Sequence, residues 1–258
     1  MSVLFEVQNA YVSYGSTEIV HGVSLSLERG ELCAFLGLNG SGKTTLLRAV
    51  CGLIPMNGQV FVDGRSLKEM NERERARHLS FIPQTSSPIQ GKTVMEVILM
   101  GANPYLGLLE SPKGEHYRAA KTALKRLEIG DFADRHFHQL SQGQKQLVIL
   151  ARTLVQNSPV MLMDEPDSAL DFCNRHMVLE KIRSVVKSEG KAGLITLHDP
   201  NFAMAYCDRL LLLKKGIVIA EADMRTAAED EVREKLSMIY GKIELFSYTG
   251  GYLMGKSQ

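Results

Sequence analysis

A glycine-rich stretch, GLNGSGKT at residues 37–44, has the spacing G-x-x-x-x-G-K-T. It follows the apolar run LCAFLGL and precedes TTLLRAVCGL, so a buried strand should lead into it and a helix should follow. Glycines allow the backbone to turn tightly with its N–H groups pointing inward. Lys43 could then reach two phosphates, and Thr44 could ligate Mg²⁺. The glycines of the loop are Gly37, Gly40 and Gly42.

This loop predicts a nucleoside triphosphate site, because the strand–loop–helix context disfavours a plain glycine-rich turn with a surface lysine. The motif alone does not choose among kinase, GTPase and ATPase.

Two adjacent acids end a second apolar run, VMLMDE at residues 160–165. In open α/β sheets, ligands bind at the carboxyl ends of the strands. Asp164 is placed to hold Mg²⁺, directly or through water. Glu165 should point to the other side of the strand, where it would suit polarising an attacking water, and Pro166 should stop the strand. A solvated acidic turn is the alternative, which the phosphate loop disfavours.

Three further residues are weaker candidates, because each residue type also has common structural roles. His198 ends the predicted strand LITLH, where its side chain could face the same pocket. Gln84 ends a short predicted strand, FIPQ, and could approach Mg²⁺ or the water. Tyr14 lies in a turn between strands ahead of the loop. Its ring could stack on a base, although a tyrosine in a strand usually only packs.

The stretch LSQGQKQ at residues 140–146 predicts the start of a helix. Ser141 and Gln144 fit a capping box, and apolar residues then recur at helical spacing. The exposed N–H groups of a capped helix N-terminus favour an anion. Ser141 adds a hydroxyl, and Gly143 would let the backbone come close to a phosphate.

A sheet must bring these residues to one edge. Strand-like and helical segments alternate along the chain, which predicts an α/β fold with an open, mostly parallel sheet. Residues 88–157 have a helical pattern and predict an inserted helical subdomain. Residues 224–240 predict a surface helix, either a solvated face or a dimer contact, and the tail after them has no clear pattern. Strands are expected within the first 30 residues and at 32–38, 59–64, 79–84, 160–164, 192–198 and 208–216.

Composition excludes several functional classes. The 258 residues suggest one large domain or two small ones. A formal net charge of +1 gives no bulk electrostatic case for binding nucleic acid or an anionic membrane. The four cysteines form no CxxC pair, which argues against a zinc site or a disulfide scaffold and fits a reducing cytosol. We expect neither a signal peptide nor a membrane span, and hence a soluble chain.

Together these motifs resemble those of the nucleotide-binding subunit of an ABC transporter, over roughly residues 3–220. Only the glycine-rich motif at 37–44 is specific by itself, but the order and spacing of all the motifs make the set specific. The resemblance identifies the adenine contact as Tyr14, Walker A as 37–45, the Q-loop as Gln84, the signature as 140–144, Walker B and the catalytic glutamate as VMLMDE, the D-loop as 168–171 and the switch histidine as His198.

The resemblance implies one nucleotide-binding domain over residues 1–258, with a P-loop NTPase core, an N-terminal antiparallel β subdomain, the helical subdomain and a C-terminal extension over about 221–258. It implies an ATPase whose two chains close head to tail around two ATP molecules with Mg²⁺. The implied nucleotide ligands are Tyr14, Gly37, Asn39, Gly40, Ser41, Gly42, Lys43, Thr44, Thr45, Asp164, Ser141, Gly143, Gln144 and Asp171. The implied metal ligands are Thr44, Gln84 and Asp164, and the implied catalytic residues are Glu165, His198 and Gln84.

Two stretches narrow the class. TVMEVILMGANPYLGLL at 93–109 and HDPN at 198–201 are similar to those in ATPases of metal-chelate importers. We therefore expect uptake of an iron–siderophore, haem, cobalamin or molybdate type substrate. The expected partners are a second copy of the chain, transmembrane permease subunits and a substrate-binding protein, but no nucleic acid. The expected location is the cytoplasmic face of the cell membrane.

Three residues differ from those common in ATPases of metal-chelate importers, and other functions stay open. Ala102 stands where arginine is common, Asp167 where threonine is common, and Gln142 where glycine is common. A membrane-partner contact could be missing at Ala102, and Gln142 is expected to be tolerated. A non-transport ABC ATPase, such as a soluble assembly factor, is the main alternative, and the 93–109 stretch argues against it. A DNA-repair ATPase would need a long coiled coil between Walker A and the signature, and no heptad pattern there predicts one. A regulatory module that binds nucleotide without turnover would not need both Glu165 and His198, so their presence argues against this alternative.

Overall fold

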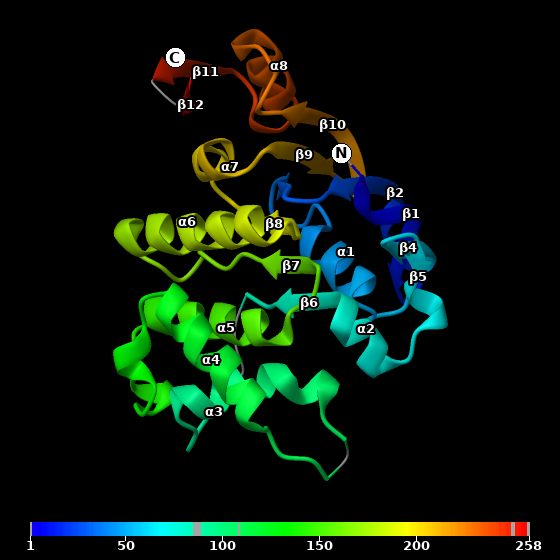
Figure 1. Cartoon of the computed structure of the whole chain (residues 1–258). Coiled ribbons are helices and arrows are strands. Elements are labelled where there is room, and N and C mark those ends of the chain that lie inside the picture. Colours follow the sequence, from blue (N-terminus) through cyan, green and yellow to red (C-terminus); the bar gives the residue numbers. More distant parts are fainter. Residues whose placement is uncertain (1, 85–88, 108, 249–250, 257–258) are drawn as a thin grey trace.

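The computed structural model describes residues 2–84, 89–107, 109–248 and 251–256. At its centre is a six-stranded sheet with the strand order β10-β9-β3-β8-β7-β6 (Figure 1). All neighbours pair in parallel except β10, which is antiparallel to β9. The predicted mostly parallel sheet is therefore confirmed. Its strands are β3 (Leu32–Leu36), β6 (Leu79–Ile82), β7 (Val160–Asp164), β8 (Ala192–Thr196), β9 (Arg209–Lys214) and β10 (Ile217–Asp223).

The central strands are buried on both faces, which explains their continuous apolar sequences. In β3, Cys33 and Phe35 face a core that includes the strands β1 (Val3–Tyr14) and β2 (Thr17–Glu28) and the helix α1 (Lys43–Val50). Leu32, Ala34 and Leu36 face a second core, with the helices α5 (Gln142–Gln156) and α6 (Phe172–Glu189). Because β3, β7 and β8 run in parallel, their carboxyl ends meet at one edge of the sheet.

A second, antiparallel sheet packs beside α1, with the strand order β2-β1-β4-β5. The strand predicted at 59–64 begins earlier, at Asn57, and ends at Val62, because Asp63 and Gly64 both have positive φ and turn the chain. The chain then forms a 3-10 turn, η1 (Leu67–Glu69), and the helix α2 (Glu72–His78). The strands of this sheet are β1 (Val3–Tyr14), β2 (Thr17–Glu28), β4 (Asn57–Val62) and β5 (Arg65–Ser66).

Helices dominate the segment between β6 and β7, drawn in green in Figure 1. The predicted start at 88 and residue 108 of the 93–109 stretch lie outside the described residues, so the subdomain boundaries stay predictions. The elements are α3 (Val94–Leu99), η2 (Met100–Tyr105), α4 (Gly114–Arg126), η3 (Gly130–Phe132), η4 (Phe137–Gln139) and α5 (Gln142–Gln156).

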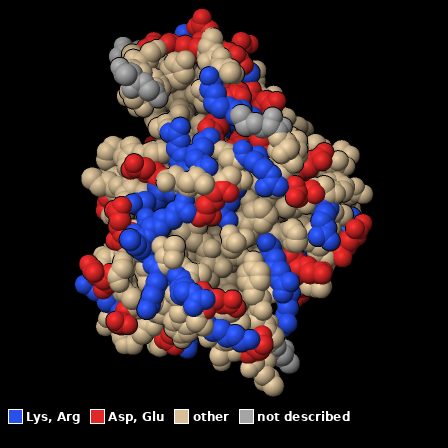
Figure 2. Space-filling model, viewed as in Figure 1, with Lys and Arg blue, Asp and Glu red and all other residues tan. Residues whose placement is uncertain are grey.

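Figure 2 shows lysines and arginines gathered over the side where α6 and α4 lie, with acidic side chains between them. Two ion pairs join the segment to α6, Arg126 with Glu189 and Lys181 with Glu128. Pairs this accessible to solvent contribute little to stability, so the buried apolar contacts between α5 and α6 hold the two parts together.

The chain ends in a helix, α8 (Glu229–Tyr240), and a hairpin of β11 (Ile243–Tyr248) and β12 (Gly251–Lys256). The helix predicted at 224–240 begins late, because Asp223 accepts hydrogen bonds from Arg225 and Ala227 and holds a turn there. The hairpin, for which the sequence offered no clear pattern, contacts both α7 (Pro200–Tyr206) and α8. None of the helices in the described ranges combines the length and the apolar character that a membrane span requires.

Candidate phosphate-binding and catalytic site

The glycine-rich loop connects the carboxyl end of β3 to α1, as predicted. Gly42 has a φ of 104°, a conformation that residues with a Cβ rarely adopt. A Cβ on Gly37 would lie 2.3 Å from the carbonyl oxygen of Leu213, so no side chain fits there. Lys43 Nζ reaches back over the loop and donates to the carbonyl oxygen of Gly37 at 2.7 Å.

Two buried donors of this loop fit a phosphate group. The hydroxyl of Ser41 is buried and has no hydrogen-bond partner. Lys43 is 5% exposed, and its burial lowers the pKa of its ammonium group, which the nearby carboxylates of Glu165 and Asp164 oppose. Phosphate oxygens would supply acceptors to both donors, and the N-terminus of α1 adds partial positive charge.

Oxygen ligands suited to Mg²⁺ lie beside the loop. Thr44 Oγ1 donates to Asp164 Oδ1 at 2.9 Å, and Thr196 Oγ1 donates to the same oxygen at 2.9 Å. Asp164 is 1% exposed, at the end of β7. A carboxylate and a threonine hydroxyl are the hard ligands that Mg²⁺ prefers, with waters and phosphates completing its shell. The residues present therefore fit the ion.

Glu165 leaves the sheet in a conformation that the sequence did not predict. Strand β7 ends at Asp164, and Glu165 has a φ of 47°, so Glu165 lies outside the strand and the side-chain alternation that the prediction assumed does not extend to it. A residue with a side chain in this region is strained, and a following proline adds to the restriction. The Glu165 N–H donates to Thr196 Oγ1 at 2.8 Å, which helps to hold the turn.

Thr196 is a site residue that the sequence reasoning missed. It is fully buried, pairs with Asp164 in the parallel register of β7 and β8, and links that carboxylate to the Glu165 backbone. The available signal was a hydroxyl at the end of the apolar run GLIT. A buried polar group in such a run needs a partner.

The three predicted catalytic residues meet in the structure. His198 Nε2 lies 2.7 Å from Glu165 Oε1, and Gln84 Nε2 donates to Glu165 Oε2 at 2.6 Å. The strand predicted to run to His198 ends at Thr196, although Leu197 is fully buried and continues the apolar pattern. His198 is half-exposed and still reaches the almost buried Glu165 side chain.

Tyr14 and the residues at the start of α5 that were predicted to bind the nucleotide take no part in the two contacts to Glu165. Tyr14 is 50% exposed at the end of β1. The predicted capping box is confirmed: Gln144 N donates to Ser141 Oγ, and Ser141 N donates to Gln144 Oε1 at 3.0 Å. A Cβ on Gly143 would lie 2.8 Å from Asn174 Oδ1, so this glycine also lets α5 approach α6.

The D-loop residue Asp171 starts α6. Its Oδ1 accepts from Asn174 N at 2.9 Å, and this hydrogen bond holds the pKa of Asp171 below its usual range. Asn174 therefore lies close to both Asp171 and Gly143. The remaining loop residues predicted as ligands are Asn39 and Gly40, which are exposed, and Thr45, which is partly buried.

The three residues that differ from those common in the metal-chelate class occupy different environments. Ala102 is fully buried in η2, where its side chain packs in the core. Gln142 is exposed at the start of α5. Asp167 is 4% exposed, and its burial raises the pKa of its carboxyl group.

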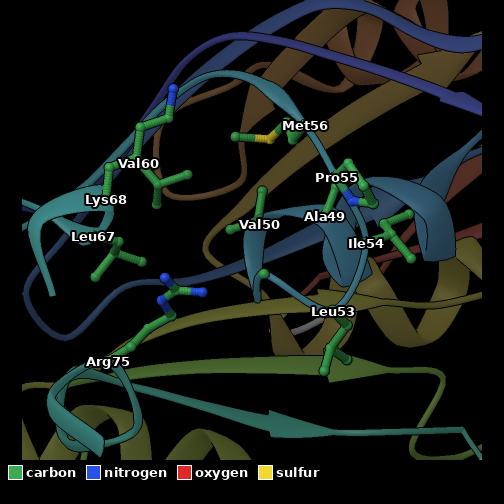
Figure 3. Close-up of a pocket in the computed structure, with 11 residues that line it drawn as sticks. Ala49, Val50, Leu53, Ile54, Pro55, Met56, Val60, Leu67, Lys68 and Arg75 are labelled. Atoms are coloured by element: carbon green, nitrogen blue, oxygen red, sulfur yellow. The ribbon is translucent and has the colours of Figure 1, made fainter. Parts of the chain in front are cut away.

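A separate cavity of about 360 Å³ lies past the C-terminal end of α1 (Figure 3). Its wall is mostly apolar, with the Arg75 guanidinium pointing into it. Since the phosphate loop lies at the other end of α1, this cavity is no part of the catalytic cluster. It is lined by Ala49, Val50, Gly52, Leu53, Ile54, Pro55, Met56, Val60, Leu67, Lys68 and Arg75.

Comparison with known proteins gives consistent matches. Residues 20–168, more than half of the chain, match the family model described as ABC transporter. An uncharacterized ABC transporter ATP-binding protein of Haemophilus influenzae is 36% identical over 224 residues, which cover 86% of this chain and 85% of the relative. The hemin import ATP-binding protein of Pseudomonas entomophila is 39% identical over 219 residues, 83% of this chain and 84% of the relative.

Solved structures show the same fold. An inward-facing structure described as a metal-chelate type ABC transporter has a TM-score of 0.82 and 27% identity, and covers 98% of this chain and 96% of that chain. The dimeric structure of the bacterial ABC transporter cassette MJ0796 has a TM-score of 0.75 and 29% identity, covering 87% of this chain and 100% of that chain. The predicted nucleotide-binding fold, with a parallel core, antiparallel strands and helices, is confirmed.

Proposed function

The chain belongs to the ABC transporter family, and on that premise we propose that it drives the uptake of a metal chelate. It carries the ATPase domain of this family and binds ATP. The observation that supports turnover best is the meeting of Gln84, Glu165 and His198 beside the phosphate loop. A module that only bound nucleotide would need no such cluster around a carboxylate.

We assign the binding of ATP to the loop and to Tyr14. The ammonium group of Lys43 and the hydroxyl of Ser41 would donate to phosphate oxygens, and the exposed ring of Tyr14 would stack on the adenine. Mg²⁺ would be held by Thr44 and Asp164, with Gln84 as a third ligand, and would neutralise charge on the phosphates. The other proposed loop ligands are Gly37, Asn39, Gly40, Gly42, Thr44 and Thr45.

Glu165 is the proposed general base. Its carboxylate accepts a proton from the attacking water, while His198 and Gln84 fix its orientation through one oxygen each. Because both oxygens are engaged, one of these contacts must open, or share its oxygen, when the water binds. The Thr196 hydroxyl accepts from the backbone N–H of Glu165 and donates to the Asp164 carboxylate, so it ties the turn at Glu165 to the end of β7.

We further propose that hydrolysis occurs between two copies of the chain arranged head to tail. Ser141, Gly143 and Gln144 form a capped helix N-terminus, which favours a phosphate. Their hydrogen bonds join them to one another and not to the phosphate loop of the same chain. A partner's loop would complete this half-site, with Asp171 at the junction, and the dimeric cassette MJ0796 supports the association of two copies.

The relatives support import as the biological role. One relative is a hemin import ATP-binding protein and another, from Bacillus anthracis, is a petrobactin import ATP-binding protein, and a metal-chelate type transporter shares the fold. The chain would work with transmembrane permease subunits and a substrate-binding protein, at the cytoplasmic face of the cell membrane. The transported substrate would be of the iron–siderophore, haem, cobalamin or molybdate type.

Uptake measurements test this proposal. A strain that lacks the chain should lose uptake of one radiolabelled chelate among haemin, a ferric siderophore, cobalamin and molybdate. The wild-type chain should restore that uptake, and Glu165→Gln should not. Unchanged uptake of all four compounds in the deletion strain would contradict the proposed import role.

A further inference from the structure

We propose that Asn201 is a positioning residue through which the C-terminal hairpin holds His198 against Glu165. The inference rests on the proposed role of His198 in hydrolysis. It assigns to the hairpin, β11 and β12, a part in the reaction although the hairpin lies outside the catalytic cluster.

One hydrogen bond joins the hairpin to the start of α7. The backbone N–H of Met254 donates to Asn201 Oδ1 at 2.6 Å, and β12 runs alongside α7 (Figure 1). Asn201 N in turn donates to Asp199 Oδ1 at 2.9 Å. Asp199 directly follows His198, so the segment from His198 to Asn201 is fixed at one end by Glu165 and at the other by β12.

This short segment needs an external anchor. Helix α7 has 7 residues, too few for a helix that is stable by itself. Pro200 in its first turn limits the backbone but donates no hydrogen bond. The other end of α7 is tied separately, because His176 Nδ1 lies 2.6 Å from the Tyr206 hydroxyl. Loss of the Asn201 contact should therefore let the His198 end of α7 shift without unfolding the helix.

The anchor itself is firmly placed. Tyr252 and Met254 of β12 pack against the main core, and Leu245 of β11 is buried in it. The Met254 N–H points to Asn201, while β12 pairs with β11 along its length. The hairpin thus holds the Met254 N–H, the donor to Asn201, in a fixed place beside the segment that carries His198.

Two substitutions in the full-length chain show whether the hydrogen bond to Met254 N, and not some other property of the Asn201 side chain, affects the rate. Asn201→Ala removes the acceptor for Met254 N. Asn201→Asp keeps an acceptor oxygen at the first turn of a helix, where a negative charge is favourable. Leu253→Ala is the matched control in β12, because that side chain is 51% exposed and the Met254 N–H is retained. Each variant is also made in a chain with His198→Ala.

Steady-state phosphate release gives the expected pattern. Asn201→Ala should lower kcat about fivefold with little change in KM for ATP, the loss expected from one hydrogen bond. Asn201→Asp and Leu253→Ala should stay within about twofold of the wild type. In the His198→Ala chain, which should itself lose about 100-fold, Asn201→Ala should cause no further loss.

Two results would overturn the inference alone: an equal loss from Asn201→Ala with and without His198, or a loss from Asn201→Asp as large as that from Asn201→Ala. If His198→Ala turned over like the wild type, the proposed role of His198 would fail too. Thermal unfolding of the variants, measured in parallel, should show them folded at the assay temperature.

Discussion

His198 Nε2 lies 2.7 Å from Glu165 Oε1, although each residue leaves a different strand. The register of the sheet explains this contact. Asp164 and Thr196 are paired at the ends of β7 and β8, so the segments that follow them, with Glu165 next after Asp164 and His198 two residues after Thr196, emerge at the same edge of the sheet. A strained turn at Glu165 and a half-exposed loop at His198 then bring the two side chains together.

Replacing the proposed base should stop turnover but not binding. In Glu165→Gln the side chain keeps its size and cannot accept a proton from water, so phosphate release should fall at least about 100-fold. ATP affinity, measured by fluorescent-nucleotide titration, should stay within about threefold. Glu221→Gln, an exposed glutamate of β10, is the control. Turnover near the wild-type rate would show that Glu165 is not the base.

The buried ammonium group of Lys43 should matter for affinity. Lys43→Ala removes a charged donor to the phosphates, which should weaken ATP binding about tenfold to 100-fold in the same titration. Lys68→Ala, at an exposed lysine beside the separate cavity of Figure 3, should bind ATP normally. Equal affinity of the Lys43→Ala variant and the wild type would contradict the phosphate-binding role of the loop.

Thr196 should support both stability and rate. Thr196→Val keeps the shape but leaves the Glu165 N–H without its acceptor, at a cost of about 1–3 kcal/mol in the free energy of unfolding. In a chain of this size each kcal/mol lowers Tm by about 2–4 °C. We expect kcat to fall as well, because the turn at Glu165 loosens. Thr196→Ser keeps the hydroxyl and should lose less of both; a Val variant equal to the wild type would exclude this role.

Asp167 should make stability depend on pH. Burial raises the pKa of its carboxyl above the ordinary value of 3.8, so between these two values the unfolded chain has lost a proton that the folded chain keeps. The contribution of Asp167 to the free energy of unfolding therefore falls as pH rises through that window. Asp167→Asn should gain in Tm relative to the wild type between pH 4 and pH 7, by calorimetry.

The control for this experiment is Asp131→Asn, at an exposed residue, whose Tm difference from the wild type should change less over the same range. A Tm difference for Asp167→Asn that stays constant or shrinks with rising pH would show that the Asp167 carboxyl is not held protonated by its burial.

The sequence predicted the central elements well because their patterns are local. The glycine spacing and the apolar run before it indicated the loop, β3 and α1, and the S-x-x-Q pattern indicated the start of α5. Strand ends were predicted less well. Leu197 is fully buried but lies past the end of β8, and hydrophobicity records burial rather than strand pairing.

Features that depend on tertiary contacts were not predictable in this way. The role of Thr196 depends on the register between β7 and β8, which no local pattern contains. The left-handed turn at Glu165 depends on the hydrogen bond to Thr196. The C-terminal hairpin is stabilised by packing on α7 and α8, and its own short strands give only a weak alternation.

Crosslinking between two different chains tests whether hydrolysis takes place at a head-to-tail interface. One chain carries Leu38→Cys in the exposed part of the phosphate loop, and the other carries Gln142→Cys in the exposed part of the signature stretch. Both also carry Cys173→Ser, which removes an exposed native thiol, and Glu165→Gln, which slows turnover.

An equimolar mixture should give a disulfide-linked dimer with ATP and Mg²⁺ and almost none without nucleotide, while either chain alone should give none in both conditions. Equal crosslinking with and without ATP, or crosslinking of either chain with itself, would contradict the head-to-tail site.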